Sequence, residues 1–190
     1  MGYINFNNAG SSFPEKSTLS IVKKYLENEK NIGGYLAESK YKKEINRFYT
    51  QLSKLINSKV TEISFLQSST HALNFFINSI NFSKNENVII FDNEYGSNYL
   101  NLLNKKINHK VCNLEQNGQV SLTDLQRKID KNTKMIFLCH IASQCGDLIN
   151  VEEVGRLIKK INKNIIFVLD ACQSIGQKEI DVKKIKCDIL

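Results

Sequence analysis

The 190-residue sequence predicts an α/β protein, a three-layer α/β/α sandwich around a mostly parallel sheet. Short apolar runs rich in β-branched residues alternate with longer segments of helical periodicity. Residues 88–91, 135–138 and 165–169 are apolar throughout, which is typical of strands covered on both faces. Polar residues follow each run at once. Because parallel strands end at one edge of the sheet, that edge is the expected ligand site.

Length, charge and cysteine content narrow the classes of function. A chain with 42% hydrophobic residues can bury one sizeable core, and no run approaches the ~18 apolar residues of a membrane span. The net charge of +7 comes from lysines spread along the predicted helices, so we expect no nucleic-acid partner. Five cysteines without C-x-x-C spacing indicate reduced thiols and no metal site. We therefore expect a cytoplasmic protein that is not embedded in a membrane.

The first third of the chain is expected to be scaffold. An irregular stretch covers residues 1–13, and Pro14 suits the first turn of a helix capped by Ser11 or Ser12. Gly33 and Gly34 end this helix, and a second helix is predicted over residues 38–56. Both helices carry apolar stripes, and that of the second is expected to face inward: Ile21, Val22, Tyr25 and Leu26 in the first, and Ile45, Phe48, Tyr49, Leu52, Leu55 and Ile56 in the second.

A short predicted strand, residues 63–66, leads into a helix that begins with Ser68, Ser69 and Thr70. Free backbone N–H groups and the positive end of the helix dipole suit an anion such as a phosphate. Capping by Ser68 or Ser69 alone explains the same residues and needs only one hydroxyl. Without further information, the cap is the better interpretation.

Polar residues also follow the later strands. Tyr95 lies beyond residues 88–91, where its ring packs in the core or stacks on a planar ligand. Cys139 and His140 resemble a nucleophile pair, but neighbours on a strand point to opposite faces. Asp170 ends the most apolar run, where it either caps a turn or faces a ligand.

The residues around Asp170 resemble a known family. Leu-Asp-Ala-Cys-Gln-Ser-Ile-Gly-Gln at 169–177, then Ile-Asp-Val at 180–182 and Cys-Asp-Ile-Leu at 187–190, are similar to the cofactor-binding stretch of the class V aminotransferases. This family of fold type I depends on pyridoxal 5'-phosphate (PLP) and includes the cysteine desulfurases. The resemblance implies that Asp170 pairs with the ring nitrogen of PLP and that Gln173 donates to the ring O3′.

The same resemblance assigns further cofactor-binding residues. The family's Thr-Thr-Glu-x-x-Asn corresponds to residues 69–74, so Ser69 and Thr70 are expected to hold the phosphate. Tyr95 stands where many members carry a His that stacks on the ring, which places desulfurase chemistry in doubt because tyrosine titrates near pH 10. Ser143 and Gln144 are candidates for the O3′ side. An amino-terminal stretch near the substrate carboxylate corresponds to Asn8, Ala9 and Gly10.

As a whole, the resemblance implies the amino-terminal part of an enzyme. Residues 1–13 correspond to an active-site arm, and residues 14–190 to part of the PLP-binding large domain. The expected substrate is an amino acid, in transamination, desulfuration, C–S lysis or epimerisation. No catalytic residue is assigned, because the Schiff-base lysine is expected beyond Leu190. The expected partner is a second copy or a complementary chain with the carboxyl-terminal half. An inactive truncated fragment and a non-PLP module for a phosphate ligand are the alternatives.

Overall fold

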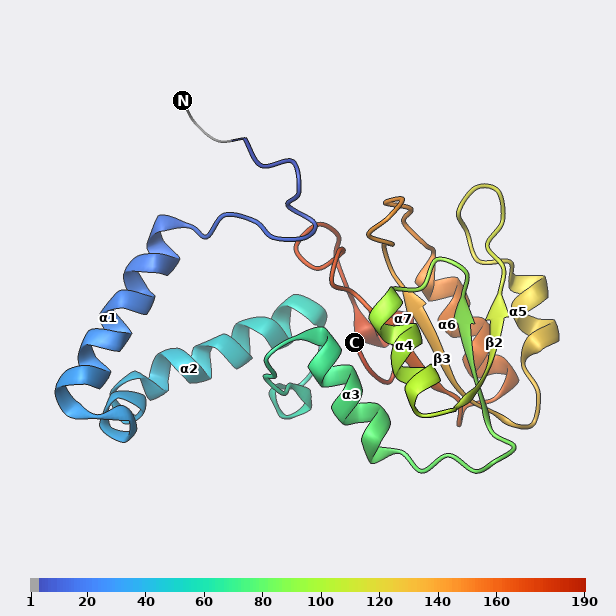
Figure 1. Ribbon diagram of the computed structural model, residues 1–190, viewed down its shortest axis with the longest axis horizontal. Coiled ribbons are helices and arrows are strands. Elements are labelled where there is room, and N and C mark those ends of the chain that lie inside the picture. The colour runs from blue at the N-terminus through green and yellow to red at the C-terminus, as the bar shows by residue number, and fades with distance from the viewer. Residues whose placement is uncertain (1–3) are drawn as a thin grey trace. The chain divides into compact units, whose positions relative to one another are not determined.

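The computed structural model describes residues 4–190, which divide into two units. The first unit ends at Lys54 and the second is Leu55–Leu190. Residues 1–3 of the predicted arm lie outside the described residues. The elements are α1 (Lys16–Ile32), α2 (Gly34–Ile56), the 3₁₀ turn η1 (Val60–Glu62), α3 (Ser69–Ser79), β1 (Asn87–Phe91), α4 (Gly96–Asn104), β2 (Asn108–Cys112), α5 (Leu122–Lys128), β3 (Thr133–Cys139), α6 (Val151–Ile161), β4 (Ile166–Asp170) and α7 (Val182–Ile185) (Figure 1).

The second unit is built on a four-stranded sheet with the order β2-β1-β3-β4. All three strand pairs are parallel, which confirms the predicted sheet. Cys139 and Asp170 are register partners at the ends of β3 and β4. A single parallel bridge joins Val168 to Ile189, so the last residues of the chain run beside β4. The carboxyl ends of the strands therefore meet at one edge, as expected.

Helices cover both faces of this sheet, which confirms the three-layer architecture. Alternate residues of β1 face opposite sides: Val88 and Ile90 pack with Leu73 of α3 and Leu102 of α4. Ile89 and Phe91 belong to the other core. That core also takes in α5, α6 and α7 through Leu125, Val154, Ile158 and Ile185. Burial on both faces explains why residues 88–91, 135–138 and 166–169 of these strands are apolar at every position.

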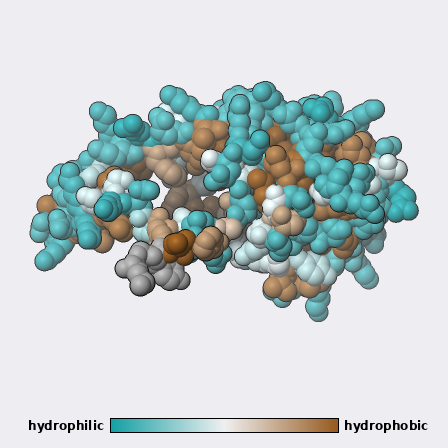
Figure 2. All heavy atoms as spheres, turned by 90° about the horizontal axis from the view of Figure 1, so that it is seen from above, coloured by the Kyte–Doolittle hydropathy of each residue, from teal (hydrophilic) through white to brown (hydrophobic). Residues whose placement is uncertain are grey.

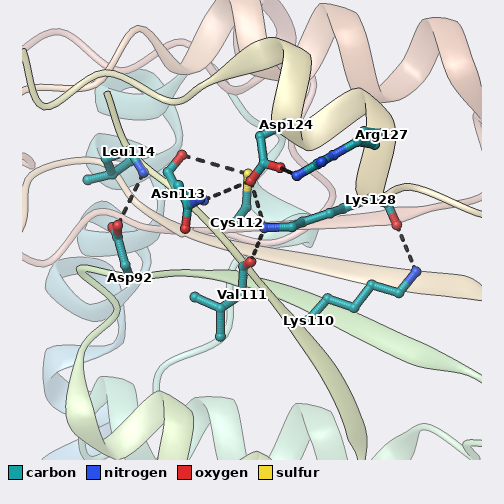
Figure 3. Close-up of polar contacts among 9 residues, drawn as sticks. All are labelled: Asp92, Lys110, Val111, Cys112, Asn113, Leu114, Asp124, Arg127 and Lys128. Atoms are coloured by element: carbon teal, nitrogen blue, oxygen red, sulfur yellow. Dashed lines mark hydrogen bonds and ion pairs between the residues drawn. The ribbon is translucent and has the colours of Figure 1, made fainter. Parts of the chain in front are cut away.

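The edge strand β2 is less apolar and is tied to α5 by charged groups (Figure 3). Asp124, only 10% exposed at its side chain, accepts from Lys128 Nζ and Arg127 Nη2, each at 2.6 Å, and from the Asn113 N–H at 3.1 Å. The Lys128 hydrogen bond holds the pKa of Asp124 well below its ordinary value of 3.8. Lys128 also donates to the carbonyl of Val111 in β2. These contacts anchor α5 on the strand it covers.

In the first unit, α1 and α2 are joined at Gly33, which has a φ of +79° and donates its N–H to the Glu29 carbonyl. The rings of Tyr25 and Tyr41 lie 5.3 Å apart, and Asn28 donates to the Tyr41 hydroxyl at 3.2 Å. The first helix begins after Glu15, which makes no side-chain cap. The expected caps Ser11 and Ser12, and Pro14 in the first turn, were therefore wrong.

The apolar stripe of α1 is largely exposed, and that of α2 is divided: Ile56 is buried as expected, Tyr49 and Leu52 are half-buried, and the others are exposed. In α1 no residue is buried, and Ile21 is 66% exposed. In α2 the expected inward positions Ile45, Phe48 and Leu55 are 38%, 46% and 53% exposed. The prediction that this stripe faces inward was wrong for these residues, because two helices bury only a narrow strip against each other. Figure 2 likewise shows hydrophobic residues exposed among hydrophilic ones.

The strand predicted over residues 63–66 is absent from the described structure. Its residues follow η1 without joining the sheet, and Phe65 is 72% exposed. A strand needs a neighbour for its backbone N–H and C=O groups, and no described strand pairs with this segment. Among the described residues, no helix has both the length and the apolar character needed to cross a membrane.

Candidate functional site

Asp170 occupies the carboxyl end of β4, and both of its carboxylate oxygens are held. Oδ1 accepts the backbone N–H of Cys172 at 2.9 Å, and Oδ2 accepts Nδ2 of Asn98 at 3.2 Å. The first bond is the turn that follows the strand, so the capping interpretation is satisfied. The second comes from α4. Asp170 is only half-buried, so its carboxylate is fixed in place yet partly open to solvent.

The Asn98 amide bridges two carboxyl groups. Its Nδ2 also donates to Oε1 of Glu94 at 2.9 Å, and Asn98 is 4% exposed. The same Glu94 oxygen accepts the Tyr95 N–H at 3.0 Å and the Cys139 thiol at 3.2 Å. Within the described part of the chain, the buried Oε2 of Glu94 has no hydrogen-bond partner. The two carboxyl groups are thus linked through one amide.

Burial raises the pKa of Glu94 above its ordinary value of 4.5. The charge of Asp170 raises it further, while the hydrogen bonds from Asn98, Cys139 and the Tyr95 N–H oppose the shift. Burial also raises the pKa of the Cys139 thiol well above 9.0, with the charges of Glu94 and Asp170 adding to the effect. Negative charge is therefore disfavoured on this thiol, which acts as a hydrogen-bond donor and not as a nucleophile.

The start of α3 lies beside the Asp170 loop. Ser68 is the cap of α3, because its hydroxyl accepts the His71 N–H at 3.1 Å. Ser69 and Thr70 are therefore not needed as caps, and both are exposed. Burial raises the pKa of the Cys172 thiol, and a hydrogen bond with Ser69 lowers it. This contact joins the first turn of α3 to the residues just after Asp170.

Thr70 links the start of α3 to the start of α4. Its Oγ1 lies 3.0 Å from the Ser97 hydroxyl in the first turn of α4. Tyr95 directly precedes α4 and is 46% exposed. Core packing, one of the two interpretations of Tyr95, is therefore incomplete, and the residue is accessible to a ligand.

The other predicted residues lie in loops at the ends of strands or in the first unit. Ser143 and Gln144 follow β3 and hydrogen-bond each other at 3.2 Å. Gln173 is half-buried, three residues after Asp170. Asn8, Ala9 and Gly10 belong to the first unit, where the Gly10 N–H donates to the Asn7 carbonyl at 3.1 Å and Asn5 Nδ2 donates to Asn8 Oδ1 at 3.0 Å. The roles of all these residues stay predictions.

His140 follows the last residue of β3 and has a different partner from Cys139, whose thiol donates to Glu94. It is 6% exposed, and its Nδ1 lies 3.0 Å from the Ser174 hydroxyl. Burial lowers the pKa of His140 below 6.5, and the charge of Lys178 contributes. His140 also lines a separate pocket of about 500 Å³ with Lys178 and Asp181. None of the predicted cofactor-binding residues lines that pocket.

The sequence did not single out Ser97, Asn98 or Glu94 as site residues. A local signal was available for two of them, since Glu94 lies just before α4 and Asn98 in its first turn, only four residues apart. Across the described residues, no group of three or more His, Cys, Asp and Glu side chains is placed to hold a metal ion.

Known proteins resemble this chain in sequence. The model of the Aminotransferase class-V family matches residues 3–190. The putative cysteine desulfurase PbSufS of Plasmodium berghei (strain Anka) is 32% identical over 196 residues, which cover 96% of this chain and 37% of that protein. A probable cysteine desulfurase of Pyrococcus abyssi (strain GE5 / Orsay) is 30% identical, with coverage of 98% and 48%.

Solved structures share the fold. The cystine C–S lyase C-DES, in complex with its reaction product cysteine persulfide, aligns with a TM-score of 0.86 at 14% identity over 95% of this chain and 50% of its own. A NifS-like protein aligns with a TM-score of 0.81 at 21% identity, covering 95% and 52%. The chain spans about half, or less, of the length of the relatives it matches.

Proposed function

This chain belongs to the aminotransferase class-V family, and from that premise we propose that it is the amino-terminal, PLP-binding part of an enzyme that acts on an amino acid. One observation supports this most. The Asp170 carboxylate is held at the carboxyl edge of a parallel sheet by Asn98 in the first turn of α4, and the contact between Thr70 and Ser97 brings the start of α3 to that same turn. A carboxylate that can pair with a ring nitrogen and a helix start that can hold a phosphate therefore lie close together.

The phosphate of PLP would lie at the start of α3. Because Ser68 makes the cap, the hydroxyls of Ser69 and Thr70 and the first free N–H groups of the helix remain available to an anion. The contact of Thr70 with Ser97 brings a third hydroxyl close by. This set of neutral donors at a helix start fits a phosphate group.

The ring would lie between Asp170 and Tyr95. A carboxylate next to the ring nitrogen favours its protonated form, because opposite charges shift a pKa toward the charged state. The exposed ring of Tyr95 supplies a flat face for offset stacking. Gln173, Ser143 and Gln144 are proposed for the O3′ side. Bound PLP supplies a ring that accepts the electrons left when a bond at the substrate α-carbon breaks.

The reaction class remains a proposal at the level of the family. The relatives are named cysteine desulfurases or a C–S lyase, whereas Tyr95 stands where a stacking His is expected from the resemblance. Tyrosine exchanges protons poorly near neutral pH. We therefore propose an amino-acid substrate, with Asn8, Ala9 and Gly10 near its carboxylate. The Schiff-base lysine is expected beyond Leu190.

Titration of the purified chain with PLP tests the proposal, with the visible absorption of the cofactor as the readout. We expect D170N, and a double variant S69A/T70A, each to weaken binding by at least about tenfold, since each removes hydrogen bonds to a charged group. Ser79→Ala, at the other end of α3, is the matched control and should bind as the wild type does. Wild-type protein that leaves the PLP spectrum unchanged would overturn the proposal. PLP binding that is unchanged in D170N would indicate that the chain recognises only the phosphate and is a module for another phosphate compound. A fragment that binds PLP but is inactive with a candidate second chain would be the truncated form.

We also propose that the chain associates, either with a second copy or with a complementary chain. The exposed apolar residues of α1 and α2, such as Ile21 and Phe48, support this, because such stripes in water favour association. Light scattering at several concentrations tests for a dimer, and co-expression with a candidate second chain tests for the other partner. All five cysteines are free, which supports the proposed cytoplasmic location.

A further inference from the structure

The amide of Asn98 has a role that the family resemblance does not assign. We infer that Asn98 is a positioning residue that holds the Asp170 carboxylate toward the ring nitrogen of PLP, and that Glu94 fixes the orientation of the Asn98 amide. The inference rests on the proposed function, because it concerns the same site.

The hydrogen bonds of the Asn98 side-chain amide fix its orientation. Nδ2 of Asn98 carries two hydrogens, and it has two carboxyl oxygens within reach, Glu94 Oε1 at 2.9 Å and Asp170 Oδ2 at 3.2 Å. The opposite orientation would place the amide oxygen against both carboxyl groups, which is repulsive. Each carboxyl group therefore selects the same orientation as the other, so Asn98 presents a donor to Asp170.

The Asp170 carboxylate is fixed in orientation but can still accept a further hydrogen bond. Its Oδ1 is held by the Cys172 N–H and its Oδ2 by Asn98, which fixes the plane of the carboxylate. Each oxygen still has a lone pair, because a carboxylate accepts about four hydrogen bonds. A ring N–H can therefore be accepted without the loss of either bond. Without Asn98, only one oxygen is held and the group is free to rotate about its last bond.

The surroundings of Glu94 disfavour a negative charge on its carboxyl group. Glu94 Oε1 collects three donors, from Asn98, Cys139 and the Tyr95 N–H, while Oε2 has none among the described residues. Burial raises the pKa of Glu94, which favours its neutral form. Burial thus disfavours a second negative charge beside Asp170, while Glu94 Oε1 still accepts the Asn98 amide.

A second asparagine of α4 provides a control for the loss of a buried side chain. Asn101 is a second buried asparagine on α4, 9% exposed, and its Nδ2 has no partner in the described residues. Its replacement by alanine removes the same atoms from a buried position of the same helix, but its Nδ2 contacts neither carboxyl group. Asn101→Ala is therefore the matched control for Asn98→Ala.

The test measures the affinity of the purified chain for PLP and for 1-deaza-PLP, which carries a carbon in place of the ring nitrogen. We expect N98A to weaken PLP binding roughly tenfold, the effect of one hydrogen bond to a charged group. Binding of the deaza analogue should change less than about twofold, and N101A should resemble the wild type with both compounds. E94Q, which keeps a neutral oxygen acceptor, should bind PLP as the wild type does, whereas E94A should resemble N98A.

Each outcome bears on one claim. Equal losses for both compounds in N98A would show general damage and overturn the inference, as would unchanged PLP affinity. Wild-type protein that binds neither compound would overturn the proposed function instead. A readout without cofactor keeps the two apart: in NMR spectra of the wild-type chain, the two side-chain N–H protons of Asn98 should exchange slowly, and E94A should accelerate the exchange. Fast exchange in the wild type would refute the amide bridge whatever the cofactor does.

Discussion

Replacement of Gly155 by alanine tests how closely α6 packs on α7 in the second unit. Gly155 lies in the middle of α6, where alanine normally stabilises a helix by up to about 1 kcal/mol. Here the added Cβ would overlap the Ile185 carbonyl oxygen of α7. It would also lie 3.1 Å from the Ile185 carbonyl carbon and 3.3 Å from Cε1 of Phe167. The usual gain should therefore be reversed.

The size of the reversal follows from what has to move. The obstacle is backbone, so the last turn of α7 must shift by roughly 1 Å to restore normal contact. Ile185 is 3% exposed in the core, and overpacking of this kind costs about 1–3 kcal/mol. Beyond α7, Asp188 accepts the Phe167 N–H at 2.7 Å and Lys159 Nζ at 2.6 Å, and a shift weakens both at about 1 kcal/mol each. After the helix gain of alanine is subtracted, the net loss is roughly 2–4 kcal/mol.

Urea unfolding followed by circular dichroism measures this loss. With a slope of about 2 kcal/mol/M, the midpoint of G155A should fall by about 1–2 M. The matched control is Gly96→Ala in the first turn of α4, because an added Cβ there meets no atom within 4 Å. We expect G96A to be unchanged or more stable by up to about 1 kcal/mol. If G155A were as stable as the wild type, the close packing of α6 on α7 would be refuted.

Two further predictions concern charged groups. D124N should lose about 1–2 kcal/mol above pH 4, because Lys128 and Arg127 lose their partner. Since the folded-state pKa of Asp124 is lowered, this difference should shrink as the pH falls below 3.8, and a constant difference in acid would contradict it. For Glu94 the sign is opposite, because its folded-state pKa is raised above 4.5. Wild-type stability relative to E94Q should fall as the pH rises from 4.5 through the folded-state pKa, and parallel pH profiles would refute the enclosed carboxyl.

The parts of the fold that the sequence predicts are those set by local pattern and by burial on two faces. Residues 88–91, 135–138 and 165–169 have apolar side chains on both sides, and such runs are stable only inside a covered parallel sheet. Residues 63–66 carry a similar pattern interrupted by Ser64, and yet no described strand pairs with them. A strand depends on its neighbour, and an isolated sequence segment does not state whether that neighbour exists.

The apolar stripes of α1 and α2 show the same limit. Periodicity predicts that a helix has an apolar face, and it predicted both helices here. It does not predict what covers that face, so Ile45 and Phe48 were expected inward and are exposed. Burial depends on the helix face and on the surface that packs against it, whereas periodicity describes only the helix face.

The candidate site divides in a similar way. Asp170 and the Ser69–Thr70 pair could be singled out because a polar residue directly after an apolar strand, or at the start of a helix, marks the carboxyl edge of the sheet. Asn98 could not be singled out by the same reasoning. Its importance depends on hydrogen bonds to Glu94, four residues away, and to Asp170, 72 residues away, and the second of these is fixed only by the strand order.

Cofactor binding and bond breaking are separable along this chain. The proposed phosphate and ring-nitrogen contacts all lie in the second unit, between Ser69 and Gln173, and the parallel sheet holds their backbone in place. The expected Schiff-base lysine does not belong to that set. PLP affinity should therefore depend on Asp170 and its Asn98 donor even where no reaction takes place. A binding measurement on this chain tests the cofactor site directly, whereas a turnover measurement would also test the expected Schiff-base lysine.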